Sequence, residues 1–223
     1  WGGGLFNFPH AILIDKDDHV WLVDRDHCVV MKFTSQGKLL LTLGARGYRS
    51  DTGADPTDFS SSAFKNVTHP GGPFNLPAGI ALAPSGEIFV ADGYANCCVH
   101  KFSPDGKRIL SWGVPGSGPG QFILPHGVWI DRRGRVLVAD RENNRVQVFT
   151  QEGRFLSEWP ARLVGPAMIY VDREDIAYVS EHNGGLVSIL TLDGERLAQW
   201  GAPETRSCHA VWADSRGDLY VVQ

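Results

Sequence analysis

The sequence has little cysteine, no long apolar run and no sustained helical periodicity. Its four cysteines show neither the paired CxxC spacing of a zinc knuckle nor the density of a disulfide-stabilised scaffold. No apolar run approaches the roughly 18 residues that a membrane-spanning helix needs, and no signal peptide opens the sequence. We therefore expect a globular chain without membrane association, whose compartment the sequence leaves open.

The sequence also lacks a marked excess of charge. It has 21 basic and 25 acidic residues among 223, a formal net charge of −4. A nucleic-acid-binding domain is expected to carry a basic face, so this balance argues against a nucleic-acid partner. We expect a monomer. The 26 glycines and seven tryptophans are typical of many short strands joined by turns.

The main feature of the sequence is a repeated unit that occurs five times. Each copy begins near an FxxP segment or a remnant of it and continues through short apolar stretches separated by polar turns. Aspartates recur five and fourteen residues after the position that follows the proline, as Asp131 and Asp140 do in the clearest copy. The copies cover residues 6–44, 74–113, 122–159, 165–201 and 207–223.

Four short strand candidates per copy predict a β-propeller. Four-stranded units of about 40–45 residues are the sequence signature of propeller blades. Trp1-Gly2 matches the Trp-Gly pairs that close other copies, and the fifth copy stops after two strands. The sequence therefore predicts one all-β domain over residues 1–223, a six-bladed propeller that is truncated within its first and last blades. A smaller propeller whose two end segments share a blade is the alternative.

Residues 45–73 form an insertion between the first two copies. The insertion is rich in glycine, serine, aspartate and proline. Long loops in compact domains are often functional, so it is either a lid or wall of a binding site or a plain surface loop.

Three histidines share one position in alternate copies. His10, His126 and His209 occupy it in copies one, three and five, whereas copies two and four have Ala78 and Ala167. The segment before strand one and the turn after strand two lie on one face of an antiparallel blade, and the innermost strands of a propeller converge on its axis. The sequence therefore predicts a three-histidine metal site with an open position, as in catalytic zinc sites. The alternative is that Pro-His is a turn dipeptide whose histidine caps the central tunnel.

The other histidines and the adjacent cysteines have simpler interpretations. The remaining histidines have no equivalents around the ring, and we expect them in loops or on the surface: His19, His27, His69, His100 and His182. Cys97 and Cys98 would point to opposite faces of a strand, as small apolar residues rather than a redox pair.

The motifs together resemble a known family. PHxxxxD with an alternating histidine, DGYAN in the second copy and ADREN in the third resemble the NHL-repeat propeller of peptidyl-α-hydroxyglycine α-amidating lyase, the second enzyme of peptide C-terminal amidation. The resemblance covers copies one to three and the histidine of copy five, whereas copy four matches poorly.

The resemblance implies roles for particular residues. The zinc ligands would be His10, His126 and His209, the catalytic tyrosine Tyr94, and one active-site arginine Arg141. A second family arginine lies in the blade before Trp1, and Arg25 is a spare cation in the turn that corresponds to that of Arg141.

The resemblance also implies features that this chain lacks in part. A structural calcium would use the carbonyl of Ile12 and a carboxylate where the chain has Ala210, so its ligand set is incomplete. The cysteines of the family's two disulfides are all missing, at Asn75 with Ala95 and at Leu137 with Val148.

The residue types fit cleavage of the C–N bond of a peptidyl-α-hydroxyglycine or a related carbinolamide to an amide and glyoxylate. Zinc would acidify the hydroxyl, and Tyr94 would act as the general base if its pKa, ordinarily near 10, is lowered. Arg141 offers a planar donor for a carboxylate or a developing negative charge, or it simply pairs with Glu142. The alternatives are a non-catalytic NHL scaffold for protein or RNA, and a lactonase-like hydrolase with calcium ligands from Glu, Asn and Asp.

Overall fold

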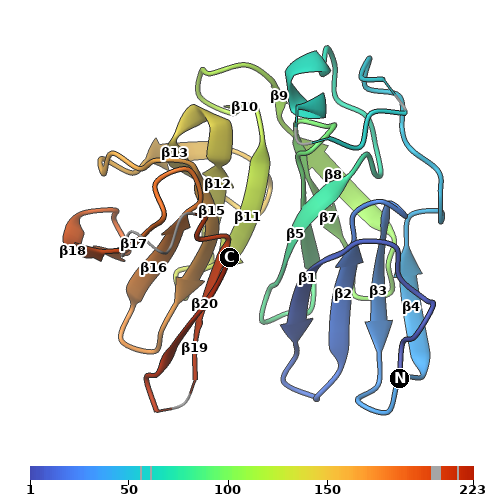
Figure 1. The fold of residues 1–223 in the computed structure, drawn as a ribbon, viewed down its shortest axis with the longest axis horizontal. Helices are drawn as coiled ribbons and strands as arrows, with labels where there is room; N and C mark the ends of the chain where they lie inside the picture. Colours follow the sequence, from blue (N-terminus) through green and yellow to red (C-terminus); the bar gives the residue numbers. More distant parts are fainter. Residues whose placement is uncertain (56, 61, 202–206, 215) are drawn as a thin grey trace. The chain divides into compact units, whose positions relative to one another are not determined.

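The computed structural model describes residues 1–55, 57–60, 62–201, 207–214 and 216–223. Its regular structure is almost entirely β-strand (Figure 1), and none of the described helices is long and apolar enough to cross a membrane. The chain divides into two compact units, Trp1–Pro125 and His126–Gln223.

The first unit contains two four-stranded antiparallel sheets, each built from consecutive strands. Figure 1 shows β1 of the first sheet beside β5 of the second. The first sheet comprises β1 (Pro9–Ile14), β2 (Val20–Asp24), β3 (Val29–Phe33) and β4 (Leu39–Leu43), and the second comprises β5 (Pro77–Leu82), β6 (Ile88–Asp92), β7 (Cys98–Phe102) and β8 (Arg108–Trp112). A short parallel pair, β9 (Val114–Pro115) and β10 (Gln121–Phe122), follows.

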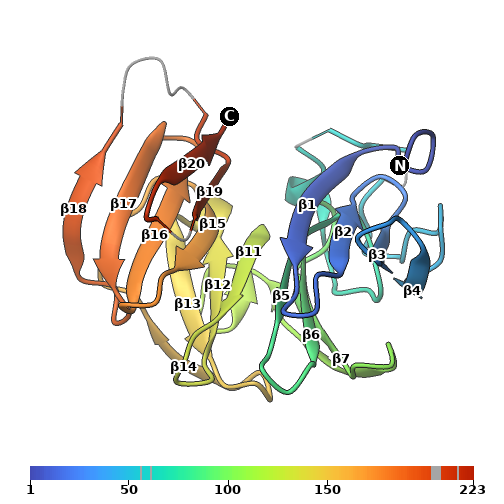
Figure 2. The ribbon, with the colours of Figure 1, turned by 90° about the horizontal axis from the view of Figure 1, so that it is seen from below.

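The second unit repeats this plan. Its two complete sheets are β11 (Pro125–Ile130), β12 (Val136–Asp140), β13 (Arg145–Phe149) and β14 (Phe155–Glu158), then β15 (Pro166–Val171), β16 (Ile176–Glu181), β17 (Leu186–Thr191) and β18 (Arg196–Trp200). A two-stranded sheet of β19 (Ala210–Ala213) and β20 (Leu219–Val222) lies beside β15 (Figure 2).

These sheets confirm the all-β class and four complete propeller-type blades, each within one of the predicted repeats. The six-bladed count stays a prediction. Among its described residues, the insertion contributes one short 3₁₀-helix, η1 (Ala63–Asn66), and another, η2 (Arg141–Asn143), follows β12.

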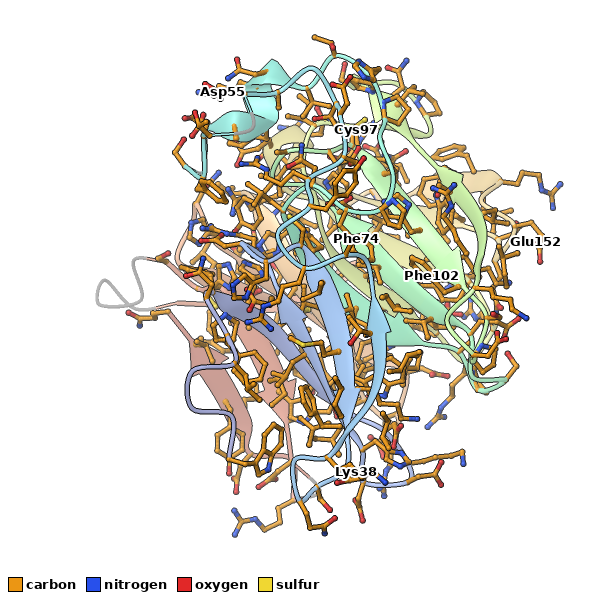
Figure 3. All side chains as sticks on the ribbon, turned by 90° about the vertical axis from the view of Figure 1, so that its right-hand side faces the viewer. Lys38, Asp55, Phe74, Cys97, Phe102 and Glu152 are labelled. Carbon is orange, nitrogen blue, oxygen red and sulfur yellow. The ribbon has the colours of Figure 1, made fainter. Side chains whose placement is uncertain are left out.

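The fourth strand of each complete blade is largely exposed. The second and third strands of the second and third blades are buried along their whole length, whereas β18 is exposed along its whole length. Apolar side chains fill the space between neighbouring blades, as Val23, Val30 and Val90 do in the first unit. Phe74 and Phe102, both labelled in Figure 3, pack with ring centroids 5.7 Å apart.

The aspartates five residues after the histidine position hold the hairpins between first and second strands. Asp15 accepts hydrogen bonds from the backbone N–H groups of Asp17 and His19, and Asp172 accepts them from Glu174 and Ile176. These carboxylates stabilise turns, and the turn hydrogen bonds of Asp15 bring Asp15, Asp17 and His19 close together.

A buried acid ends the second strand of every complete blade: Asp24, Asp92, Asp140 and Glu181. Its carboxylate accepts hydrogen bonds from the backbone that enters the first strand, for example from Asn7 and Phe8 to Asp24 and from Asn75 to Asp92. The aspartate fourteen residues after the histidine position therefore joins the two ends of the first hairpin. The repeated acid at this position therefore has a structural role.

The expectation that His100 lies in a loop or on the surface is wrong. His100 is in β7 and wholly buried, with Nε2 3.1 Å from Asp92 Oδ2 and Nδ1 2.7 Å from Ser111 Oγ. The arrangement has the composition of a hydrolase triad. However, the equivalent residues in the next blade are Asp140, Gln147 and Glu158. The position is therefore part of a polar network in the second, third and fourth blades, whereas the first blade has Met31 there.

Candidate functional site

The Pro-His dipeptides lie at the start of the innermost strands, as predicted. His10 is the second residue of β1, and its Nδ1 lies 2.7 Å from the carbonyl oxygen of Ala78. His126 holds the same place in β11, and its Nδ1 lies 2.8 Å from the carbonyl oxygen of Ala167. In each unit the histidine of one blade thus contacts the backbone of the alanine at the equivalent position of the next blade.

This contact determines the tautomer of both rings. A carbonyl oxygen only accepts hydrogen bonds, so Nδ1 must carry the proton and donate it. The neutral ring then has its lone pair on Nε2. Metal-binding histidines are commonly oriented in this way, with one nitrogen donating to a carbonyl and the other bound to the ion. His10 and His126 are therefore both prepared to bind a cation through Nε2.

In the second unit, His126 and His209 lie together. Their ring centroids are 4.8 Å apart, and a ring nitrogen of each lies within 4.8 Å of one of the other. Burial lowers the pKa of His209 to about 4, and the nearby His182 and Arg141 act in the same direction. His209 is therefore neutral at physiological pH, the form that coordinates a metal.

Tyr94 contacts His10 in the first unit. It lies in the turn after β6, and its ring is buried, with only 4% of the residue exposed. Its hydroxyl donates a hydrogen bond to His10 Nε2, with 3.1 Å between the two atoms. The phenol therefore lies directly beside the nitrogen at which an ion would bind. Gly93 precedes it because a Cβ there would lie 2.2 Å from the carbonyl oxygen of Pro125.

Arg141 lies in η2, directly after the buried Asp140, and is itself 4% exposed. Its Nε donates to Glu142 Oε1 at 3.0 Å, so the predicted pairing with Glu142 exists. The positive charge of Arg141 still acts on its neighbours despite this pairing, because it helps to lower the pKa values of both His182 and His209. Arg141 and these histidines therefore share one electrostatic environment in the second unit.

Two further residues, His182 and Arg25, lie beside the candidate site residues. His182 follows Glu181 as Arg141 follows Asp140, and its ring lies 5.6 Å from that of His209, with Nδ1 2.9 Å from Ser207 Oγ. Arg25 occupies the same turn position in the first blade and lies against the Tyr94 ring, 5.2 Å from its centroid. Their common position in the repeat was the available signal.

The cysteines are poor candidates for covalent chemistry. All four are free and buried. Burial raises the pKa of the Cys28 thiol to about 12 and that of Cys208 to about 11, so neither forms the thiolate needed for nucleophilic attack at neutral pH.

Comparison with known proteins places the repeat unit. The NHL repeat family matches residues 74–102 and 122–149. The chain is 36% identical over 166 residues to peptidyl-glycine alpha-amidating monooxygenase of Mus musculus. This alignment covers 70% of this chain and 15% of that protein. It is 33% identical over 177 residues to peptidyl-alpha-hydroxyglycine alpha-amidating lyase 1 of Drosophila melanogaster, covering 74% of this chain and 29% of that protein.

A relative named for the repeat alone is similar to a comparable degree. NHL repeat-containing protein 3 of Homo sapiens is 32% identical over 161 residues, which are 68% of this chain and 42% of that protein. The chain thus spans less than half the length of each of these relatives.

Among solved structures, an H270A virginiamycin B lyase from Staphylococcus aureus with quinupristin matches with a TM-score of 0.65. The match covers 96% of this chain and 62% of that one at 19% identity, a level that supports the fold alone.

Proposed function

We propose that this chain, which carries NHL repeats and is homologous to the peptidyl-α-hydroxyglycine α-amidating lyases, forms part of a zinc-dependent lyase of that type. The substrate would be a peptidyl-α-hydroxyglycine or a related carbinolamide, and the products an amide and glyoxylate. The observation that carries the proposal is the shared tautomer of His10 and His126, each fixed by a carbonyl of the following blade.

The donor set suits zinc. Three neutral imidazoles from His10, His126 and His209 leave a fourth position open, the pattern of catalytic zinc sites. The proximity of His126 and His209 supports their sharing one ion, because Zn–N bonds of roughly 2.0–2.1 Å bring two ligand nitrogens close together. When bound, zinc would lower the pKa of the substrate hydroxyl and stabilise negative charge on its oxygen.

Tyr94 is suited to remove the proton from that hydroxyl. Its oxygen lies 3.1 Å from His10 Nε2, and its ring is shielded from solvent. As the proton leaves, the hydroxyl oxygen forms the glyoxylate carbonyl. The C–N bond breaks, and its electron pair passes to the amide nitrogen, which takes up a proton. Arg141 supplies a buried positive charge that would stabilise the negative charge developing on the substrate during the reaction.

Replacement of Tyr94 by Phe tests this proposal. The variant retains the buried ring and loses only the hydroxyl, so it should bind zinc as the wild type does while glyoxylate release falls by roughly 10²–10⁴-fold. Glyoxylate is measured by coupled oxidation and zinc by elemental analysis. Undiminished turnover would remove Tyr94 from this role. A protein with neither turnover nor zinc would favour the alternative of an interaction scaffold, which the similarity to NHL repeat-containing protein 3 keeps open.

A further inference from the structure

We infer that Arg25, within the proposed lyase function, binds the carboxylate of the substrate's C-terminal hydroxyglycine. Arg25 lies in the turn after β2, and its backbone N–H donates to the carbonyl of Phe8 at 3.0 Å. Its guanidinium carbon lies 4.0 Å from the centroid of the Phe8 ring and 5.2 Å from that of Tyr94. A positive charge is thus fixed beside the side chain proposed to act as the base.

The guanidinium group is held on two of its three nitrogens. Nε donates to Asp26 Oδ1 at 2.7 Å, and Nη2 donates to the carbonyl oxygen of Phe59 at 3.4 Å. Within the described part of the chain, no acceptor lies within hydrogen-bonding distance of Nη1. A planar group that is already oriented loses little conformational freedom when it binds an anion. Arg25 therefore offers a preoriented donor for one carboxylate.

The insertion forms part of the same surface. Arg49 donates from Nη1 and Nη2 to the carbonyl of Asp58 at 3.3 Å, and its guanidinium carbon lies 4.5 Å from the Phe59 ring centroid. Two arginines therefore hold the backbone at Asp58 and Phe59 against the turn of Arg25. This is the arrangement expected of a binding-site wall rather than of an unattached surface loop.

An exposed apolar ring lies beside the proposed anion site. Phe8 is 43% exposed, and its ring lies against the guanidinium of Arg25. Phe59 is 42% exposed, and its ring lies against the neighbouring Arg49. The carboxylate belongs to the last residue of the substrate, so a neighbouring peptide side chain would reach such a surface. The chemistry favours a peptide that ends in a free carboxylate and has an apolar residue before the hydroxyglycine.

A binding comparison tests the inference separately from catalysis. N-acetyl-Phe-Gly lacks the hydroxyl and cannot be cleaved, and its methyl ester lacks the charge. Both are titrated calorimetrically into the zinc-loaded, full-length protein. A hydrogen bond to a charged group favours the acid over the ester by roughly tenfold or more. R25Q should bind both ligands with the affinity of the ester, and R25K should show an intermediate preference. R108Q, which changes an exposed arginine of β8, should retain the wild-type preference.

The outcomes distinguish this inference from the proposed function. A wild type without preference for the acid, or an R25Q variant that keeps the preference with normal zinc content and melting temperature, would overturn the role of Arg25. If R25Q loses the preference but the wild type releases no glyoxylate, the anion site stands and the lyase proposal fails.

Discussion

His100 and Asp92 should make the stability of the protein depend on pH through one identifiable pair. Burial lowers the pKa of His100, but hydrogen bonds and charge from Asp92 and Cys98 outweigh this effect and raise it to about 9, from an ordinary value of 6.5. A raised histidine pKa contributes stability that is fully present below the unfolded value and is lost as pH rises through the folded value. The window is therefore pH 6.5 to 9.

The magnitude follows from the same values. A shift from 6.5 to about 9 corresponds to about 3 kcal/mol at about 1.4 kcal/mol per unit. His100→Gln introduces the residue that the third blade has at the equivalent position, where Gln147 Nε2 donates to Asp140 Oδ2. The variant therefore keeps a donor to Asp92 and loses the titrating group.

Urea unfolding followed by tryptophan fluorescence at pH 6 and pH 9.5 measures the effect. The wild type should lose about 3 kcal/mol more of its free energy of unfolding across this interval than His100→Gln does. His69→Gln changes a half-exposed histidine of the insertion and should behave as the wild type. Equal losses in the wild type and His100→Gln would refute the assignment of a charged, buried His100.

Two further outcomes are expected. After washing with chelator, His126→Ala or His209→Ala should reduce the zinc content from about one ion per chain to a small fraction, as measured by elemental analysis. The control His69→Ala should keep its zinc. Full zinc retention by both site variants would exclude the two histidines as ligands. Gly93→Ala should destabilise the protein by about 1–3 kcal/mol in thermal unfolding, because the new Cβ would lie 2.2 Å from the Pro125 carbonyl oxygen. Gly3→Ala should leave stability unchanged, because its Cβ would have no atom within 4 Å. Equal melting temperatures of the two variants would contradict this packing argument.

Much of the fold could be predicted because the repeat imposes it. Four blades follow from the period, and the aspartates that mark the repeat stabilise the hairpins and the entry to the first strand. His100 was misassigned because the residue at its position differs between copies, as Gln147 does in the third blade, and its partners Asp92 and Ser111 lie on neighbouring strands. A single side chain in an alternating strand does not reveal which layer it faces.

The residues of the candidate site could be selected from the sequence, but their contacts could not. His10, His126 and His209 were found by comparing copies, and Tyr94 by its motif. The carbonyl partners of the histidines were not predictable, because backbone acceptors leave no mark in the sequence. Arg25 and His182 share the turn position of Arg141, but the sequence around this position differs between the copies. The shared position was therefore the only sign that connected them with the candidate site.

The alanine carbonyls have a consequence for how such a chain can change. In both units a histidine-bearing blade is complete only with the alanine-bearing blade that follows it, since Ala78 and Ala167 fix the imidazole tautomers. The smallest unit that could be duplicated or lost without breaking such a contact is therefore a pair of blades. Duplication or loss of one blade would place two histidines in neighbouring blades or leave one without its acceptor, whereas exchange of two blades together would keep His10 and His126 each with its alanine carbonyl.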